Sequence, residues 1–177
     1  CLDYATQNGV SAIDTAAAYG NAEEVVGAFL AKRTIPRDKL FISTKLRPNI
    51  LDTLDAGELK KTIRENLQGS LKMLHTDYVD AYLLHSSRYA YRPDILEALS
   101  IVGKEGLARK VGVSVYEPEE AMACMRQGDM NFIQLPYSIF DHRMAHGGVF
   151  EEAESCKCQI HARSAFIQGL ITLSEDQ

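Results

Sequence analysis

The chain has 177 residues, of which 46% are hydrophobic and 24% are charged, and its formal net charge is −5. This length and balance predict one globular domain spanning residues 1–177, and the alternating pattern described next predicts that its class is α/β. The acidic balance and the lack of a Lys/Arg cluster argue against nucleic acid and membrane-surface partners. The apolar runs are too short to span a membrane and the sequence shows no signal segment, so we expect a cytoplasmic protein.

Patterns of helical and strand period alternate along the chain. A stripe of Leu59, Ile63, Leu67, Leu71 and Leu74 indicates a long helix that packs on a sheet. In chain order we predict a helix over 2–8, a strand over 10–13, a helix over 22–32, a strand over 41–44, the long helix, a strand over 78–84, a helix over 93–105, a strand over 109–113, a helix over 118–127 that stops at Gly128, and strands over 132–133 and 159–162. Six strands separated by helices predict right-handed crossovers and a parallel sheet.

Side chains capable of chemistry follow the ends of these strands. The carboxyl ends of parallel strands meet at one edge of the sheet, and enzymes with a (β/α)₈ barrel assemble their active sites at that edge. We therefore expect one site built from Asp14, Tyr19, Lys45, His85, Ser114, Gln134 and Ser164.

The first four of these residues suggest acid–base chemistry at a carbonyl group. A free phenol has a pKa of about 10, which is awkward for proton transfer at neutral pH. We expect the cation of Lys45 to lower the pKa of Tyr19, with Asp14 orienting Lys45 through an ion pair. His85 is placed to hydrogen-bond the same reacting oxygen.

Other polar residues are interpreted as structural. The spacing of Cys1, Cys124, Cys156 and Cys158 matches neither a disulfide framework nor a four-ligand zinc site, so we expect no metal. Arg37, Lys39 and Arg47 are expected to be solvated surface charges.

The similarity to a known family lies in residues 13–20, 43–45, 80–85, 106–114, 132–137 and 163–170, which together extend along nearly the whole chain. These stretches resemble the aldo-keto reductase family. The last two resemble its bacterial branch, which reduces varied aldehydes, ketones and sugars.

The resemblance implies a (β/α)₈ TIM barrel, of which about six of the eight strands are represented here. It also implies hydride transfer between a nicotinamide cofactor and a small carbonyl or alcohol substrate, with Asp14, Tyr19, Lys45 and His85 as the catalytic tetrad and Tyr19 as the general acid. NADP is the expected cofactor, with NAD as the other possibility. The expected cofactor contacts are Ser114 and Gln134 to the nicotinamide amide, Arg163 stacked beneath the ring, and Ser164, Gly169 and Leu170 near the pyrophosphate.

The chain departs from the family pattern in two ways. Val115 stands where many relatives have Asn. A complete barrel takes about 200 to 250 residues or more, so we expect the domain to be incomplete at both ends and the functional protein to be longer. A non-catalytic interaction domain on the same fold therefore stays open as an alternative. A phosphate-binding lyase or isomerase would need a metal cluster or acid/base pair that the sequence does not show.

Overall fold

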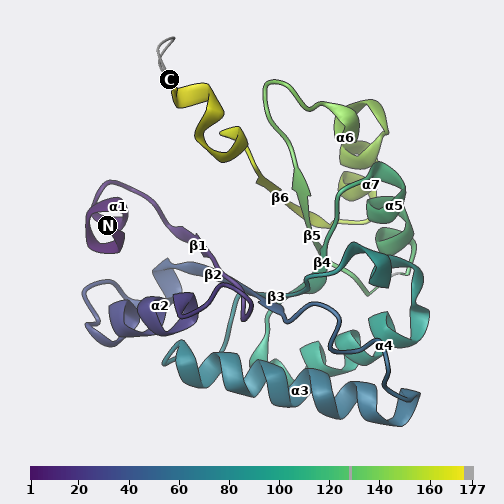
Figure 1. Cartoon of the computed structure of the whole chain (residues 1–177), viewed down its shortest axis with the longest axis horizontal. Coiled ribbons are helices and arrows are strands. Elements are labelled where there is room, and N and C mark those ends of the chain that lie inside the picture. Colours follow the sequence, from purple (N-terminus) through teal and green to yellow (C-terminus); the bar gives the residue numbers. More distant parts are fainter. Residues whose placement is uncertain (128, 174–177) are drawn as a thin grey trace.

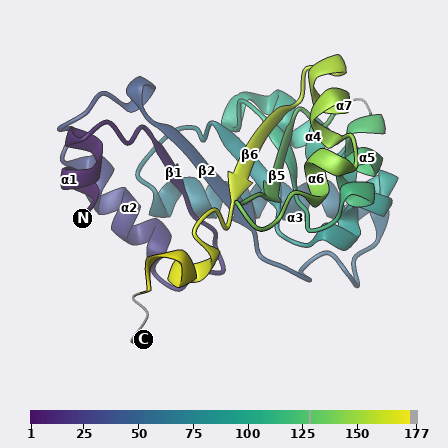
Figure 2. The ribbon, with the colours of Figure 1, turned by 90° about the horizontal axis from the view of Figure 1, so that it is seen from above.

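The computed structural model of the protein describes residues 1–127 and 129–173. Within these residues six parallel strands form one sheet whose spatial order follows the chain, from β1 to β6. The sheet curls, and the helices cover its outer side (Figures 1 and 2). The strands are β1 Ala12–Asp14, β2 Phe41–Leu46, β3 Ala81–Leu84, β4 Val111–Ser114, β5 Phe132–Pro136 and β6 Gln159–Arg163. The predicted partial barrel of six parallel strands is confirmed.

Helices connect successive strands, as the alternating pattern predicts. They are α2 Ala22–Ala31, α3 Ala56–Met73, α4 Pro93–Val102, α5 Pro118–Arg126, α6 Arg143–His146 and α7 Val149–Ser155, while α1 Leu2–Gln7 precedes β1. Short 3₁₀ or π segments cover Arg37–Lys39, Ser87–Tyr91, Gly103–Leu107 and Ile167–Thr172. The sequence patterns did not predict α6 and α7, which lie between β5 and β6. The predicted stop at Gly128 lies outside the described residues.

The apolar stripe on α3 forms the centre of the core. All five of its residues are buried, and Ile63, Leu67 and Leu74 are completely inaccessible. Burying a side chain of this size stabilises the fold by about 1.5–3 kcal/mol. A capping box of Asp55 and Glu58 fixes the start of α3, because the backbone N–H of Asp55 donates to Glu58 Oε2 at 3.3 Å. The stripe therefore anchors the longest helix to the sheet.

The start of β3 differs from the prediction for a physical reason. Tyr78 precedes the strand, and its ring lies between the guanidinium groups of Arg37 and Arg109, at 4.2 and 4.1 Å from the ring centroid. Both guanidiniums donate to the buried carboxylate of Asp80, at 2.8 Å from Arg37 and 3.1 Å from Arg109. The prediction that Arg37 is a solvated surface charge is therefore wrong, since it ties the amino ends of two strands together.

The segment after β6, which carries Ser164, Gly169 and Leu170, does not continue into an α-helix. Residues Ile167–Thr172 form a 3₁₀ segment in which Gln168 and Gly169 have positive φ values of 55° and 91°. A helix N-terminus that could hold phosphate is therefore not formed at this point of the described chain. Among the described residues, no helix is both long and apolar enough to cross a membrane.

Candidate active site

An ion pair joins the carboxyl ends of β1 and β2. Lys45 Nζ donates to Asp14 Oδ2 at 2.7 Å and to the backbone oxygen of Thr15 at 2.9 Å. The Lys45 side chain is only 1% exposed, whereas that of Asp14 is 39% exposed. Burial lowers the pKa of Lys45, and the charge of Asp14 opposes this shift. The expected ion pair is therefore formed, and the carboxylate favours the charged form of the buried lysine.

The loop after β1 carries Tyr19 over this pair. The backbone N–H of Ala17 donates to the carbonyl of Lys45 at 3.1 Å, and that of Tyr19 donates to Ala16 at 3.0 Å. The turn ends at Gly20, whose φ of +61° favours a residue without a side chain. These contacts place the Tyr19 ring centroid 5.1 Å from Lys45 Nζ.

His85 directly follows β3 and completes the predicted group. Its ring centroid lies 5.6 Å from that of Tyr19, in an edge-to-face arrangement. Burial, followed by the charge of Lys45, lowers the pKa of His85, so the imidazole is neutral at pH 7. Its Nδ1 is buried and has no hydrogen-bond partner in the described structure. All four residues of the predicted tetrad thus converge at one edge of the sheet.

The ionisation of Tyr19 differs from the expectation. Its pKa is raised, first by burial and then by the charge of Asp14, while Arg163 acts in the opposite direction. The expected lowering of this pKa by Lys45 is not observed, because the Lys45 ammonium is paired with Asp14. Tyr19 consequently retains its proton at neutral pH.

Ser114 and Gln134 lie side by side at the ends of β4 and β5. The two residues are paired in register, and the Ser114 hydroxyl donates to Gln134 Oε1 at 3.2 Å. Both are buried, with exposures of 4% and 2%. The amide nitrogen of Gln134 and the acceptor lone pairs of the Ser114 hydroxyl give this pair capacity for a further amide ligand.

Arg163 ends β6, and its guanidinium faces an aromatic ring of the protein. Its Cζ lies 4.2 Å from the ring centroid of Tyr116, and Nη2 donates to the carbonyl oxygen of Val115 at 3.0 Å. Ser164, Gly169 and Leu170 lie on the segment that follows. Leu170 is 59% exposed, and Ser164 Oγ accepts a 3.3 Å hydrogen bond from Arg163 Nη1. The structure therefore gathers Ser164 with Arg163, on the side of the site formed by β6.

Two residues at the site were missed by the sequence reasoning. Ser43 Oγ donates to Asp14 Oδ1 at 2.7 Å, and Tyr116 stacks on Arg163. Ser43 lies two residues before Lys45, and residues i and i+2 of a strand share a face, so its place was recoverable from the sequence. Tyr116 lies in a loop, and no sequence signal indicates its contact.

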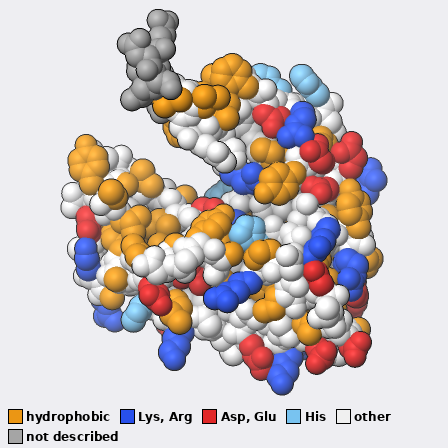
Figure 3. All heavy atoms as spheres, in the orientation of Figure 1, with side chains coloured by type: hydrophobic (Ala, Val, Ile, Leu, Met, Phe, Trp, Pro, Cys, Tyr) orange, Lys and Arg blue, Asp and Glu red, His pale blue; other side chains and the backbone are white. Residues whose placement is uncertain are grey.

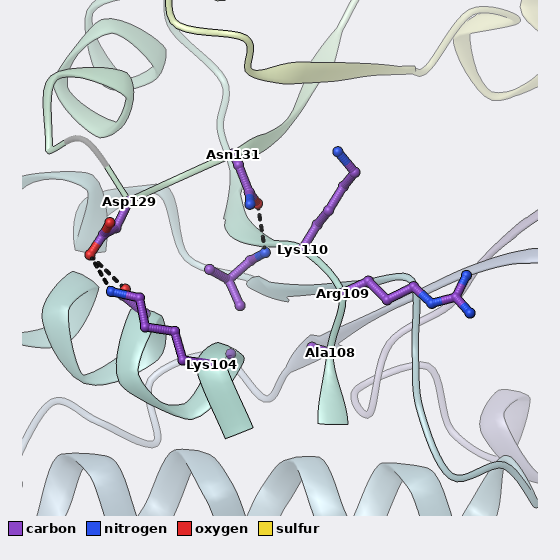
Figure 4. A pocket seen from close by; sticks show the side chains of 9 residues that line it. Lys104, Ala108, Arg109, Lys110, Asp129 and Asn131 are labelled. Atoms are coloured by element: carbon purple, nitrogen blue, oxygen red, sulfur yellow. Dashed lines mark hydrogen bonds and ion pairs between the residues drawn. The ribbon is translucent and has the colours of Figure 1, made fainter. Parts of the chain in front are cut away.

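Hollows occur at both edges of the sheet. The surface is hollowed between the part of the chain near β1 and the segment after β6 (Figure 3). At the carboxyl ends, a hollow of about 280 Å³ is lined by residues that include Tyr137, Phe140 and Ser164. A second hollow of about 310 Å³ lies at the opposite, amino ends of β4 and β5, where Lys104 pairs with Asp129 and Asn131 accepts from the backbone of Val111 (Figure 4). In parallel barrels the amino-terminal edge serves stability, so the carboxyl edge is the candidate active site.

Comparisons with known proteins agree with this geometry. NADH-specific methylglyoxal reductase of Escherichia coli is 29% identical over 97% of this chain and 58% of its own length. The holo form of aldo-keto reductase AKR11C1 from Bacillus halodurans superposes with a TM-score of 0.81 at 26% identity, covering 99% of this chain and 60% of that one. An aldo/keto reductase from Klebsiella pneumoniae, solved in complex with NADP and acetate, has a TM-score of 0.73 at 26% identity, covering 92% and 56%.

The chain thus spans less than two thirds of the length of these relatives. The family model described as the aldo/keto reductase family matches residues 1–177. The strands, their order and the solved relatives all agree with that match. The chain belongs to the aldo/keto reductase family.

Proposed function

We propose that the protein is an NAD(P)H-dependent carbonyl reductase whose general acid is Tyr19. The observation that carries this proposal is that Tyr19 lies close to both the Asp14–Lys45 pair and His85. The centroid of the Tyr19 ring is 5.1 Å from Lys45 Nζ and 5.6 Å from the centroid of the His85 ring. A phenol, a buried ammonium and a neutral imidazole at one strand edge are suited to protonating an oxygen on which negative charge develops.

Reduction of a carbonyl adds one hydride to the carbon and one proton to the oxygen. Tyr19 supplies the proton, because its raised pKa keeps the hydroxyl protonated until the alkoxide develops. The phenolate left behind is stabilised by the ammonium of Lys45. Since Tyr19 is 48% exposed, it regains its proton from solvent.

Asp14 and His85 have supporting roles. Asp14 keeps Lys45 charged and oriented through the 2.7 Å ion pair. His85, neutral at pH 7, donates a hydrogen bond to the substrate oxygen and so orients the carbonyl towards Tyr19.

The described residues fit a nicotinamide cofactor. When bound, such a cofactor supplies the hydride. The buried pair of Ser114 and Gln134 would hold its carboxamide, and the buried N–H of Arg163, which has no partner in the described structure, also calls for a ligand. Ser164, Gly169 and Leu170 would border its phosphates. We propose NADP, with NAD as the other candidate; one relative was solved with NADP and another is named for NADH.

We propose small aldehydes, ketones or sugars as substrates. One relative is named methylglyoxal reductase and another, from Saccharomyces cerevisiae, D-arabinose 1-dehydrogenase. The test is to follow oxidation of NADPH and NADH by the intact purified protein with methylglyoxal and with a simple aldehyde. Turnover that disappears in Tyr19→Phe supports the proposal. Cofactor binding without any turnover would instead favour a non-catalytic domain.

A further inference from the structure

Glu23 is a buried carboxylate in the first turn of α2. The residue is 8% exposed, and its Oε1 accepts a 2.6 Å hydrogen bond from the hydroxyl of Thr44, which is completely buried. Among residues 1–127 and 129–173, none of the ion pairs within 4.0 Å includes Glu23. The free N–H groups of the first helical turn offset part of the cost of burying this charge. A buried carboxylate without a cation still calls for a reason.

The hydrogen bond between Glu23 and Thr44 ends beside a reacting group. Thr44 directly precedes Lys45 on β2, and successive side chains of a strand point to opposite faces. Lys45 accordingly reaches Asp14 at the site, whereas Thr44 reaches Glu23 on the side of α2. One short stretch of β2 is thus held from both of its faces.

The loop that carries Tyr19 is fixed to the same strand at both of its ends. Near its start, the backbone N–H of Ala17 donates to the carbonyl of Lys45 at 3.1 Å. At its end, the backbone N–H of Ala22 donates to the carbonyl of Tyr19 at 3.1 Å, and the next residue is Glu23. The hydrogen bond from β2 to Glu23 therefore closes the loop on the strand that carries Lys45.

Tyr19 depends on this loop for its position. The residue is 48% exposed, so packing around its own ring restrains it weakly. A general acid must lie within hydrogen-bond reach of the oxygen that it protonates. A displacement of about 1 Å, even when caused by a change far from the reacting atoms, can lower the rate by about 10²-fold.

We propose that Glu23 is a positioning residue, which through its hydrogen bond with Thr44 holds the loop so that Tyr19 stays over Lys45. The inference rests on the proposed reductase function and adds a residue that acts through Tyr19 rather than on the substrate. A hydrogen bond to an ionised carboxylate is about twice as strong as one between neutral groups. The buried charge therefore gives the loop a firmer anchor than a neutral side chain would.

The test removes the hydroxyl of Thr44 with little change in shape. With methylglyoxal and NADPH or NADH, Thr44→Val should lower the kcat of the intact protein by about 10- to 100-fold. KM should change little, because the groups that contact substrate and cofactor remain. Thr44→Ser keeps the hydroxyl and should restore most of kcat. A kcat of Thr44→Val equal to that of the wild type would overturn the inference.

A second variant covers the case in which Thr44→Val does not fold. Glu23→Gln keeps the size of the side chain and an acceptor oxygen but removes the charge. The hydrogen bond weakens without being lost, so kcat should fall by a smaller factor, about 3- to 10-fold. A wild-type kcat in this variant would show that the charge of Glu23 does not matter and would overturn the inference.

Ser100→Ala is the matched control. The hydroxyl of Ser100, which is also buried, donates to the carboxylate of Asp129 at 2.8 Å, but it lies at the amino-terminal edge of the sheet. This variant should lower the stability measured by urea unfolding and leave kcat unchanged. Equal falls of kcat in Ser100→Ala and Thr44→Val would show that lost stability alone explains both, and this result also overturns the inference.

A measurement without turnover separates this inference from the proposed function. The ring centroids of His85 and Tyr19 are 5.6 Å apart, so the NMR chemical shifts of the His85 imidazole report where the Tyr19 ring lies. These signals should move in Thr44→Val, return in Thr44→Ser and stay in place in Ser100→Ala. Unchanged signals in folded Thr44→Val overturn the inference. Absence of turnover in the wild type would contradict the reductase proposal alone, since the chemical shifts still decide the role of Glu23.

Discussion

The Asp14–Lys45 pair should respond asymmetrically to removal of its two members. Asp14→Asn leaves the ammonium of Lys45, which is 1% exposed, without its counter-charge. Breaking a buried pair in this way costs about 3–5 kcal/mol. The carbonyl of Thr15 still accepts from Lys45 Nζ at 2.9 Å, and Asp14 is 39% exposed, so we expect a loss of about 2–4 kcal/mol. The loss of stability cannot exceed about 4.6 kcal/mol at pH 7, because at that cost Lys45 would lose its proton instead of staying buried as an unpaired charge.

Lys45→Met should be far milder. The remaining carboxylate of Asp14 keeps the 2.7 Å hydrogen bond from Ser43 and reaches solvent, and methionine fills the space of the lysine chain. We expect a change below about 1 kcal/mol, of either sign. The free energy of unfolding, measured by urea denaturation at pH 7, checks both variants. The double variant should resemble Lys45→Met, because it contains no stranded charge.

The asymmetry also has a pH dependence with a definite sign. In Asp14→Asn the folded-state pKa of Lys45 lies further below its unfolded value, so the unfolded chain binds more protons. Stability of this variant should therefore rise with pH from about 7 to about 10, relative to the wild type. A loss in Asp14→Asn no larger than that in Lys45→Met, or a difference that does not shrink at alkaline pH, would refute the reasoning.

Three further predictions test the acid, the histidine and the core. Tyr19→Phe should lower kcat/KM for a simple aldehyde by about 10²- to 10⁴-fold and leave the NADPH dissociation constant, measured by cofactor fluorescence, nearly unchanged; near-wild-type turnover would exclude Tyr19 as the acid. The pKa of His85 is lowered by burial and then by Lys45, so its contribution to stability is present above about pH 6.5 and is lost as the pH falls through the folded-state pKa; His85→Gln should flatten the unfolding free energy over this range, and an unchanged pH profile would contradict this linkage. Leu67→Ala should cost about 2–5 kcal/mol in urea unfolding, against less than about 0.5 kcal/mol for Val25→Ala, which is 52% exposed, and equal losses would contradict the packing of α3.

Local pattern predicted the six strands and most of the helices, because strand period and helix stripe are properties of short segments. It failed where a contact joins distant segments. Arg37 was assigned to the surface, yet its partner Asp80 lies 43 residues along the chain. The pKa of Tyr19 was given the wrong sign because burial and the pairing of Lys45 with Asp14 depend on the folded arrangement. A carboxylate at the start of an apolar strand, as in Asp80, is the signal that could have indicated a buried cation.

The candidate site ultimately depends on the register of β1 against β2. Ile13 pairs with Ile42 and Asp14 pairs with Ser43, and the two isoleucines are buried at 8% and 0% exposure. Because successive side chains of a strand point to opposite faces, burial of the isoleucines on one face turns Asp14, Ser43 and Lys45 to the other. A slip of one residue would expose an isoleucine and turn Asp14 away from Lys45. The apolar residues that stabilise the fold are therefore also the residues that aim the carboxylate at the lysine.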